Sequence, residues 1–249
     1  MRPIVPQGRP QTLVLFGVSG GGKSTLAATA PRPAYLDTND GLMSIAGRPG
    51  FEHVRGERIS TFNALEDAYS NFTNTGRKKW KGKFDTVVVD HFDDLQAIIM
   101  ETLGERRAER DDRKDADEAE QRDWGIMANK LKRILRAYKT LPMHKILICG
   151  EKESKEDGRM IPSLQGQMSG ALPYFADHIA YLRIGKNGQR WIHLDPGNEF
   201  NAKTRAWWLT PEQRKFKVDF NQLDTITQLF ARIAAGPGRA ATDAAEPGE

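Results

Sequence analysis

The strongest constraint on the fold is a glycine-rich stretch near the N-terminus, GVSGGGKST, at residues 17–25. It follows the apolar run TLVLF and precedes LAATA, so it lies between a predicted strand and a predicted helix. Four residues lie between Gly17 and Gly22, and Lys23 and Ser24 follow Gly22 directly. This is the spacing of a phosphate loop. The stretch therefore predicts a nucleoside-triphosphate site at this turn.

The residue types of the loop explain how it would hold a nucleotide. Glycines let the backbone curl so that several N–H groups point at phosphate oxygens, and the start of the helix adds partial positive charge. We expect Lys23 to reach the β- and γ-phosphates and the Ser24 hydroxyl to coordinate Mg²⁺, so ATP and Mg²⁺ are the expected cofactors. A glycine-rich turn that serves packing alone is the alternative. The predicted nucleotide-binding residues are Gly17, Val18, Ser19, Gly20, Gly21, Gly22, Lys23, Ser24 and Thr25.

A second acidic residue is needed to help hold the Mg²⁺ through water. Asp90 ends the apolar run TVVVD and is the candidate, while an aspartate that only caps the next helix is the alternative. His91 follows Asp90, at the position where many ATPase motors place the glutamate that activates water. The sequence therefore predicts that the catalytic base comes from another segment.

Three further segments offer groups that could act on the phosphates. Asp40 follows the strand PAYLD, at the edge where ligands bind in open α/β sheets, and is either the base or part of a turn. Glu151 follows the strand KILICG and either senses the γ-phosphate, contacts a loop or faces water. Lys203 and Arg205 would share one face of a strand, and such cations stabilise charge in phosphoryl transfer. Their spacing alone favours the alternative, a solvated edge strand.

Apolar runs of strand length alternate with amphipathic helical patterns, which predicts an α/β fold with a mainly parallel sheet flanked by helices. Asp93 is the expected N-cap of one helix, and Asn187-Gly188 between alternating runs predicts an antiparallel hairpin at one edge. Residues 105–123 are mostly charged and form either a solvated helix or a mobile segment. Residues 153–170 form a long loop or small hairpin. Strands are expected at 11–16, 33–37, 83–90 and 145–150, and helices at 23–30, 61–72, 93–103, 124–141 and 221–233.

The composition predicts one domain with flexible ends. Residues 1–10 are expected to form an arm, residues 11–235 an ATPase domain and residues 236–249 a disordered tail. The chain has no run of 18 apolar residues and no signal-peptide pattern, which predicts a cytoplasmic protein without a membrane partner. One buried cysteine, Cys149, excludes an internal disulfide and makes a zinc cluster improbable. A net charge of +4 permits nucleic-acid binding without arguing for it.

Several stretches between residues 11 and 210 resemble the RecA-like ATPases of bacteriophages, the small single-strand annealing or recombinase type often called phage nucleotide-binding proteins. They are LFGVSGGGKSTLA, AYLDTNDGL, FDTVVVDHFDDL, DWGIMANKLKRIL, KILICGEKE, IPSLQGQMSGALPYFADHIAYL and NAKTRAWW. The resemblance implies a RecA-like P-loop core, ATP-dependent action on single-stranded DNA, and homo-oligomers in which ATP lies between subunits. For a phage-encoded chain it places the protein in the host cytoplasm.

The resemblance also implies roles for particular residues. Lys203 and Arg205 would act in trans on the nucleotide of a neighbouring subunit, and residues 152–170 would face DNA. The family has a glutamate after the second strand, in an Asp-Thr-Glu pattern, where this chain has Asn39. Because asparagine cannot act as a base, either hydrolysis is slow or Asp40 substitutes for the missing glutamate.

Three functions remain open, and we favour the first. It is an ATP-dependent, single-stranded-DNA-binding protein that promotes annealing or homologous pairing, with a single-strand-binding protein as a further candidate partner. Its support is the resemblance, the basic arm at 2–9 and the cationic face of helix 124–141, while Trp191, Trp207 and Trp208 would either stack on bases or pack. The second is a nucleoside or small-molecule kinase, which needs a second pocket and a lid. The third is a non-hydrolysing ATP switch that binds a partner protein, which Asn39 fits.

Overall fold

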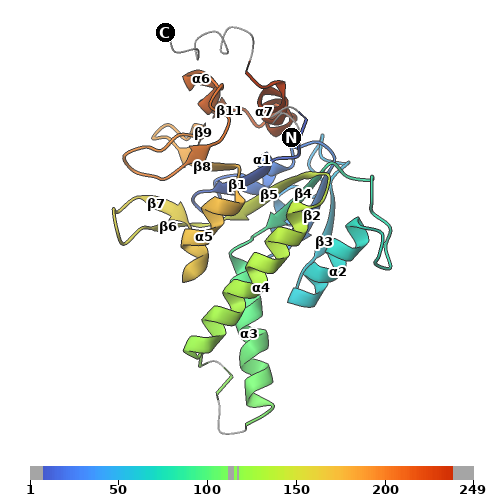
Figure 1. The fold of residues 1–249 in the computed structure, drawn as a ribbon. Helices are drawn as coiled ribbons and strands as arrows, with labels where there is room; N and C mark the ends of the chain where they lie inside the picture. The colour runs from blue at the N-terminus through green and yellow to red at the C-terminus, as the bar shows by residue number, and fades with distance from the viewer. Residues whose placement is uncertain (1–7, 112–114, 117, 238–249) are drawn as a thin grey trace, which may run out of the picture.

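A nine-stranded sheet with helices on both faces forms the centre of the molecule (Figure 1). The computed structural model describes residues 8–111, 115–116 and 118–237. The strands are β1 (Thr12–Phe16), β2 (Pro33–Asp37), β3 (Arg55–Arg58), β4 (Thr86–Asp90), β5 (His144–Cys149), β6 (Glu151–Glu153), β7 (Met160–Pro162), β8 (His178–Ile184), β9 (Arg190–His193), β10 (Lys203–Thr204) and β11 (Lys215–Val218). The helices are α1 (Lys23–Ala27), the 3-10 helix η1 (Gly41–Ser44), α2 (Phe62–Phe72), α3 (Asp94–Ala108), α4 (Gln121–Lys139), α5 (Gln167–Phe175), α6 (Pro211–Arg214) and α7 (Thr225–Ala235).

The strand order is β11-β9-β8-β1-β5-β4-β2-β3, and β10 also pairs with β8. The strands from β8 to β3 run parallel to one another. Strands β9, β10 and β11 are antiparallel additions at the β8 edge, and the turn at residues 185–188 joins β8 to β9. The predicted α/β fold, with its mainly parallel sheet and an antiparallel hairpin at one edge, is confirmed.

Both faces of the central parallel strands β1, β2, β4 and β5 are buried, which explains why their sequences are mostly apolar. In β1, Val14 and Phe16 pack in a core with α2, α3, α4 and α5. The alternate side chains, Leu13 and Leu15, pack on the opposite face with α1 and α7. Because side chains alternate along a strand, one short run supports two cores. The buried strands thus hold the ends of the sheet, where polar groups emerge, in fixed positions.

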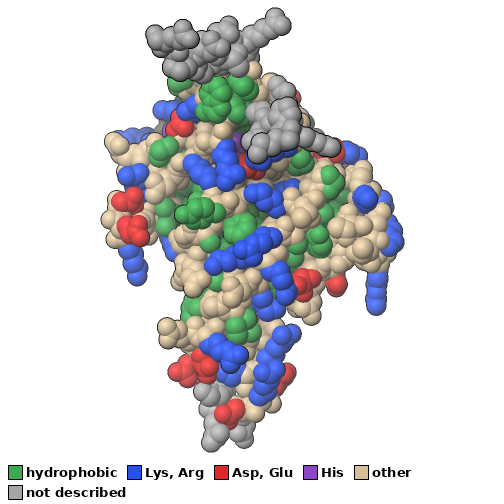
Figure 2. All heavy atoms as spheres, in the orientation of Figure 1, with side chains coloured by type: hydrophobic (Ala, Val, Ile, Leu, Met, Phe, Trp, Pro, Cys, Tyr) green, Lys and Arg blue, Asp and Glu red, His purple; other side chains and the backbone are tan. Residues whose placement is uncertain are grey.

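Helices α3 and α4 extend beyond the predicted limits into the charged segment 105–123, and together they project from the sheet (Figure 1). Arg107 forms an ion pair with Asp123 and donates to the carbonyl oxygens of Asp115 and Glu118. A guanidinium thus anchors the described part of the connection between these helices. The polar face of α4 carries the predicted lysines and arginines, and Figure 2 shows cationic side chains along this part of the surface.

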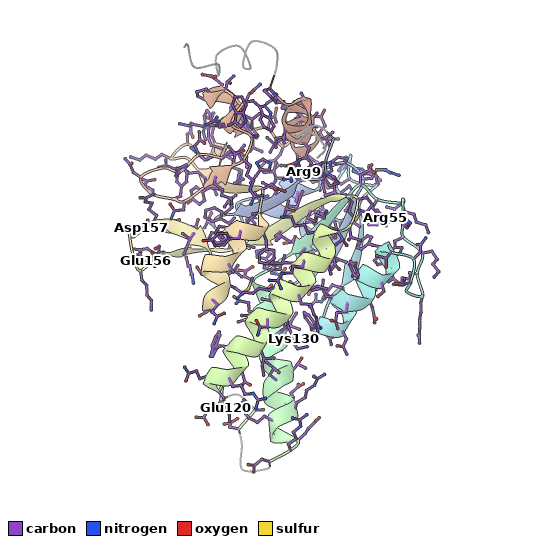
Figure 3. The ribbon with its side chains drawn as sticks, viewed as in Figure 1. Arg9, Arg55, Glu120, Lys130, Glu156 and Asp157 are labelled. Atoms are coloured by element: carbon purple, nitrogen blue, oxygen red, sulfur yellow. The ribbon has the colours of Figure 1, made fainter. Side chains whose placement is uncertain are left out.

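The segment 153–170 contains a hairpin rather than a long loop. Strands β6 and β7 pair antiparallel, and Glu156 and Asp157 lie at the tip between them (Figure 3). Helix α5 then begins at Gln167, inside the predicted loop. Helix α1 ends at Ala27, earlier than expected. The short elements η1, β3, α6 and β11 were not predicted, because each is only four residues long. A strand was considered at Lys203 and Arg205, and β10 covers Lys203–Thr204 there.

The chain ends and the cysteine complete this description. Residues 1–7 of the predicted arm and residues 238–249 of the predicted tail lie outside the described residues. In the part of the chain that the structure describes, no helix has the length and apolar character needed to cross a membrane. Cys149 is a free, buried thiol in β5.

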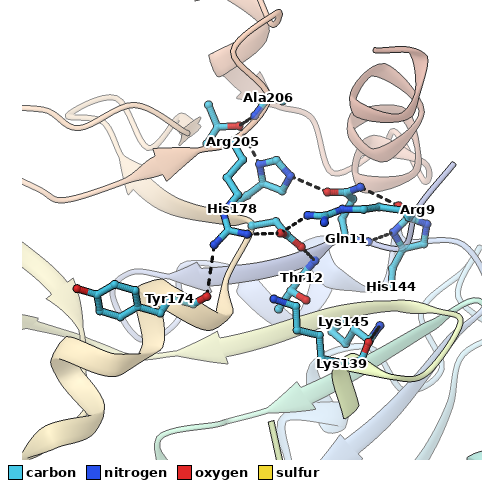
Figure 4. A network of polar contacts seen from close by, with 12 residues as sticks. Arg9, Gln11, Thr12, Lys139, His144, Lys145, Tyr174, His178, Arg205 and Ala206 are labelled. Carbon is cyan, nitrogen blue, oxygen red and sulfur yellow. Dashed lines mark hydrogen bonds and ion pairs between the residues drawn. The ribbon is translucent and has the colours of Figure 1, made fainter. Parts of the chain in front are cut away.

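A network of buried polar groups lies at the amino ends of β1 and β8 (Figure 4). The carboxylate of Asp177, 2% exposed, pairs with Arg9 and Arg205 and accepts the backbone N–H of Thr12 at 3.0 Å. His178 is also buried, with Nδ1 2.8 Å from the Thr204 hydroxyl and Nε2 3.1 Å from the Gln11 side-chain oxygen. Burial lowers the pKa of His178 to about 4, so this ring is neutral at pH 7.

We expect His178 to make the protein sensitive to mild acid. Its folded-state pKa of about 4 lies below the ordinary 6.5, so the unfolded chain binds more protons between these values and stability falls as pH falls. His178→Gln removes this titration, and the variant should lose about 1 kcal/mol less unfolding free energy than the wild type between pH 6 and pH 5. Urea unfolding at both pH values measures the difference. Equal losses in the two proteins would contradict this role of His178.

Candidate functional site

The phosphate loop joins β1 to α1 at the carboxyl end of the sheet, and its glycines are fixed by close contacts. A Cβ atom at Gly17 would lie 2.5 Å from the carbonyl oxygen of Leu182 in β8. Gly22, with φ of 97°, precedes α1, and a Cβ atom there would lie 2.5 Å from Cζ of Phe220. These approaches exclude larger residues at both positions. Loop geometry therefore depends on β8 and on the segment after β11.

Lys23 lies inside the loop and is 4% exposed. Its ammonium donates to the carbonyl oxygens of Gly17 and Val18 at 2.8 and 2.9 Å. Burial lowers the pKa of Lys23, while the negative charges of Asp93 and Asp90 oppose the change. The ammonium is therefore held by neutral carbonyl oxygens, with acidic side chains nearby. It could exchange the carbonyl oxygens for phosphate oxygens.

Asp90 ends β4 and is fully buried, at 0% exposed. Among the described residues, neither carboxylate oxygen has a hydrogen-bond partner of good geometry. Burial raises the pKa of this carboxyl group, and the nearby Ser24 hydroxyl and His91 oppose the rise. Buried polar atoms without partners are rare in proteins, and a carboxylate beside a hydroxyl is the oxygen-rich setting that Mg²⁺ prefers. The predicted metal ligands Ser24 and Asp90 are thus brought together and fit the ion.

His91 is a site residue whose role the sequence did not predict. Its Nε2 lies 3.4 Å from an Asp90 oxygen and its Nδ1 lies 3.4 Å from an Asp93 oxygen. Burial alone would lower the pKa of His91, but the hydrogen bond to Asp93 and the charge of Asp90 outweigh it, so the pKa is raised. The imidazole therefore lies between two carboxylates, those of Asp90 and Asp93. The sequence did contain one signal for this role, because His91 directly follows the strand-end acid Asp90.

Asp93 was expected to cap α3. Its position at the N-cap is as predicted, but the expected capping hydrogen bond of its side chain is absent among the described residues. Instead, its carboxylate accepts the backbone N–H of Gly150 at 3.0 Å and lies beside His91. Asp93 therefore joins the ends of β4 and β5, since a strand-end amide offered a better partner than the first turn of the helix.

A cavity of about 570 Å³ opens over the loop. This volume is typical of a small-molecule site and accommodates a nucleotide. Three of its residues, Arg48, Arg190 and Phe220, come from segments that the sequence analysis did not connect with the loop. The lining is Ser19, Gly20, Gly22, Lys23, Ser24, Thr25, Asp40, Gly41, Ser44, Arg48, His91, Arg190 and Phe220.

Asp40, one candidate base, lines this cavity from the turn after β2. It has a left-handed backbone, with φ of 64°, and its exposed carboxylate pairs with Arg58 at the end of β3. The preceding acid, Asp37, holds the turn by accepting the backbone N–H of Gly41 at 2.9 Å. Asp40 therefore combines a turn position with access to the nucleotide cavity, and its role as base stays a prediction.

Glu151, the candidate sensor, begins β6 directly after the end of β5. One carboxylate oxygen is buried and has no hydrogen-bond partner among the described residues. Its charge acts on the pKa of Lys23, and together with burial it raises the pKa of Tyr181 to about 12. The side chain therefore faces inward near the loop lysine rather than lying free in water.

Lys203 and Arg205 lie at the other end of the sheet. Thr204 pairs with His178, which is level with Leu13 near the start of β1. The phosphate loop begins after Phe16, three residues farther along, or about 10 Å at 3.3 Å per residue. The Lys203 ammonium donates to the carbonyl oxygen of Pro173, and Arg205 bonds Asp177 at 3.1 Å. The structure does not bring these two cations to the loop of their own chain.

The comparisons with known proteins agree with a nucleotide-binding core. Residues 9–206, most of the chain, match a family model described as an AAA domain. This range includes the phosphate loop, Asp90, Glu151 and the two cations at 203 and 205. No curated protein matches the chain.

We expect Lys23→Ala to weaken binding of Mg²⁺–ATP about 100-fold or more, because it removes a charge-assisted bond to two phosphates. Lys145→Ala is the matched control, since Lys145 is also a buried lysine that donates to a carbonyl oxygen, that of Leu141 at 2.7 Å. Lys145 lies in β5 at the amino end of the sheet, and its loss should leave the affinity within about twofold. Titration with a fluorescent ATP analogue measures both. Tight binding by Lys23→Ala protein would contradict the assignment of the loop.

Proposed function

The chain belongs to the AAA domain family, and from this premise we propose that it is a Mg²⁺-dependent ATPase that acts on single-stranded DNA. In this proposal, ATP-bound subunits assemble on the strand and promote annealing or homologous pairing, as in the phage RecA-like ATPases that the sequence resembles. The observation that carries the nucleotide part is the buried carboxylate of Asp90, without a hydrogen-bond partner among the described residues and next to the Ser24 hydroxyl and the Lys23 ammonium.

Each residue of the site would have a defined role. The backbone N–H groups of the loop hold the phosphates, and Lys23 exchanges its two carbonyl partners for phosphate oxygens. Asp90 and Ser24 would hold Mg²⁺, which when bound neutralises charge on the β- and γ-phosphates. His91 would help to orient Asp90, because its Nε2 lies 3.4 Å from an Asp90 oxygen. The proton of the attacking water passes to Asp40 or Glu151, which both lie near the loop.

The DNA part of the proposal is supported by the cationic face of α4. Lys132, Arg136 and Lys139 point away from the core on this helix, and Arg136 stacks over the Phe175 ring at 5.8 Å. Trp207 is 56% exposed and offers a stacking surface, whereas Trp191 and Trp208 are only partly exposed. Lysines and arginines along a surface bind the DNA backbone, and exposed aromatic rings stack on bases.

The hairpin β6–β7 supports the same partner. A groove of about 740 Å³ separates this hairpin from α5 and from the segment before β10. Lys152, Lys155, Arg159 and Lys203 line the groove, together with the acidic Glu153 and Glu156. The segment that the resemblance assigns to DNA therefore offers a cavity with several cations.

The non-hydrolysing switch is the second candidate. Asn39 cannot act as a base, and the carboxylate of Asp40 is engaged by Arg58. A site of this kind would bind Mg²⁺–ATP and change its partner affinity without turnover. The kinase alternative has no specific support, since it requires an acceptor pocket next to the γ-phosphate.

We expect Mg²⁺–ATP to strengthen binding of a fluorescent single-stranded oligonucleotide, with affinity falling steeply as salt rises. The triple variant with Lys132, Arg136 and Lys139 changed to Ala should bind more weakly and lower the salt slope by about two. A matched control replaces Lys78, Lys79 and Lys81, on the loop after α2, and should leave the slope unchanged. Fluorescence anisotropy over a salt series measures both.

The same assay, run with a phosphate-release measurement, separates the candidate functions. Absence of DNA binding at low salt would contradict the proposal. Nucleotide-dependent binding without phosphate release would favour the switch, and transfer of phosphate to an added nucleoside would favour the kinase.

We propose further that Lys203 and Arg205 act on the nucleotide of a neighbouring subunit, because they lie far from their own loop. Arg205→Ala protein and Lys23→Ala protein should each be inactive, while a mixture should regain part of the ATPase activity, since mixed interfaces contain one intact site. Arg9→Ala is the matched control, because Arg9 pairs with the same Asp177 carboxylate. Arg9→Ala should keep its activity. Failure of every mixing ratio to restore turnover would overturn the trans role.

A further inference from the structure

The segment after residue 206 lies outside the family match, yet it packs directly on the nucleotide site. Strand β11 pairs with β9, with Phe216 opposite Ile192. Helix α7 is fixed to the end of α1, because Thr29 accepts the backbone N–H of Ile226 at 2.9 Å and the hydroxyl of Thr227 at 2.8 Å. These contacts hold the intervening residues 219–224 over the loop.

Phe220 lies in this held stretch, with its ring edge against Gly22 of the phosphate loop. The Arg190 guanidinium, from β9, lies over the same ring at 5.4 Å from its centre. Arg190 Nε also donates to the carbonyl oxygen of Gly21 at 2.8 Å. Both side chains line the cavity that contains Lys23 and Ser24. An aromatic ring and a planar cation therefore form one wall of the nucleotide cavity.

The chemistry of this wall differs from that of the phosphate end. Arg190 forms an ion pair with no carboxylate among the described residues, so its charge is not neutralised by the protein there. A planar guanidinium stacks on aromatic systems, and a purine base stacks on both aromatic rings and guanidinium planes. The loop already supplies the donors for the phosphates, so a flat surface beside it suits the base.

We propose that Arg190 and Phe220 form the base-binding wall of the nucleotide site, on which the base of the bound nucleotide stacks. This inference rests on the proposed function, because it needs a nucleotide in the cavity. Stacking recognises the π-face of a base rather than its edge groups. The wall therefore contributes affinity for a nucleotide, which has a base, over a bare polyphosphate.

The competing location for the base is the part of the cavity beside Arg48. Arg48 follows η1, lines the cavity and lies over the Phe51 ring at 5.9 Å. Its side chain is exposed and, among the described residues, makes no hydrogen bond to the phosphate loop, unlike that of Arg190. Arg48→Ala therefore serves as the variant that distinguishes the two walls.

The test compares binding of Mg²⁺–ATP with binding of Mg²⁺–tripolyphosphate, which has the phosphates but no base. Phe220→Leu keeps an apolar side chain against Gly22 and removes the ring. It should weaken ATP binding by about fivefold to 100-fold and leave tripolyphosphate binding within about twofold. Phe216→Leu is the matched control on β11 and should change neither affinity. Arg48→Ala should also leave the ratio of the two affinities unchanged. Isothermal titration calorimetry measures all of these values.

A second variant keeps the inference testable if Phe220→Leu unfolds. Arg190→Lys retains the charge but removes the planar group, and it should weaken ATP more than tripolyphosphate. Thermal unfolding without ligand checks that each variant is folded.

Three results would overturn the base-binding wall. They are equal weakening of both ligands by Phe220→Leu, unchanged ATP affinity, and a loss of the ATP preference in Arg48→Ala alone. If the wild-type protein binds neither ligand, the proposed nucleotide function fails and the wall fails with it. If the wild-type protein binds both ligands and no variant loses the preference for ATP, the base-binding wall is overturned while the proposed nucleotide function stands.

Discussion

The buried carboxylate of Asp90 imposes a charge requirement that the neighbouring groups satisfy only in part. A carboxylate removed from water loses hydration, and for Asp90 this loss raises the pKa more than the nearby Ser24 hydroxyl and His91 lower it. The Lys23 ammonium brings positive charge to the same place, but Asp93 and Glu151 bring more negative charge. A divalent cation together with phosphates would pair these groups, since the metal takes the acid oxygens and the phosphates take the lysine. The charges of these side chains would therefore be better balanced with a metal–nucleotide complex bound than in the empty loop.

The two ends of the parallel sheet carry opposite parts of the proposed machinery. The carboxyl ends of β1, β4 and β5 hold the loop, Asp90 and Glu151. The amino ends of β1 and β8 carry Arg205, tied to Asp177. In head-to-tail assembly, each subunit contacts the next through a different surface of its own. Such assembly requires complementary surfaces at the two ends of the subunit. The proposed trans role of Arg205 therefore depends on the length of the strands as much as on its own charge.

Local pattern was sufficient to predict those parts of the site that are continuous in sequence. The phosphate loop carries its own spacing, and Asp90 follows three valines because β4 is buried on both faces. The sequence could not predict Phe220 beside Gly22, or Arg190 on the Gly21 carbonyl, because those contacts join residues far apart in the chain. It placed Asp93 correctly at the start of α3 but missed the bond of its side chain to Gly150, which depends on how β4 and β5 pair.

The turn after β2 connects the metal site to the question of the base. Asp37 holds the backbone N–H groups of Asn39 and Gly41, so the turn is rigid. A Cβ atom at Gly41 would lie 2.6 Å from an Asp90 oxygen, so this backbone packs against the proposed metal ligand. Asp40 is next to Gly41, and among the described residues its side chain is held only by an exposed ion pair with Arg58. Such pairs contribute about 0–1 kcal/mol. The backbone of Asp40 is thus fixed relative to Asp90, while its carboxylate is free to exchange Arg58 for a water molecule at the nucleotide. Glu151 differs from Asp40 in its side chain. The Glu151 carboxylate is partly buried and lies beside Tyr181, so it is held in place.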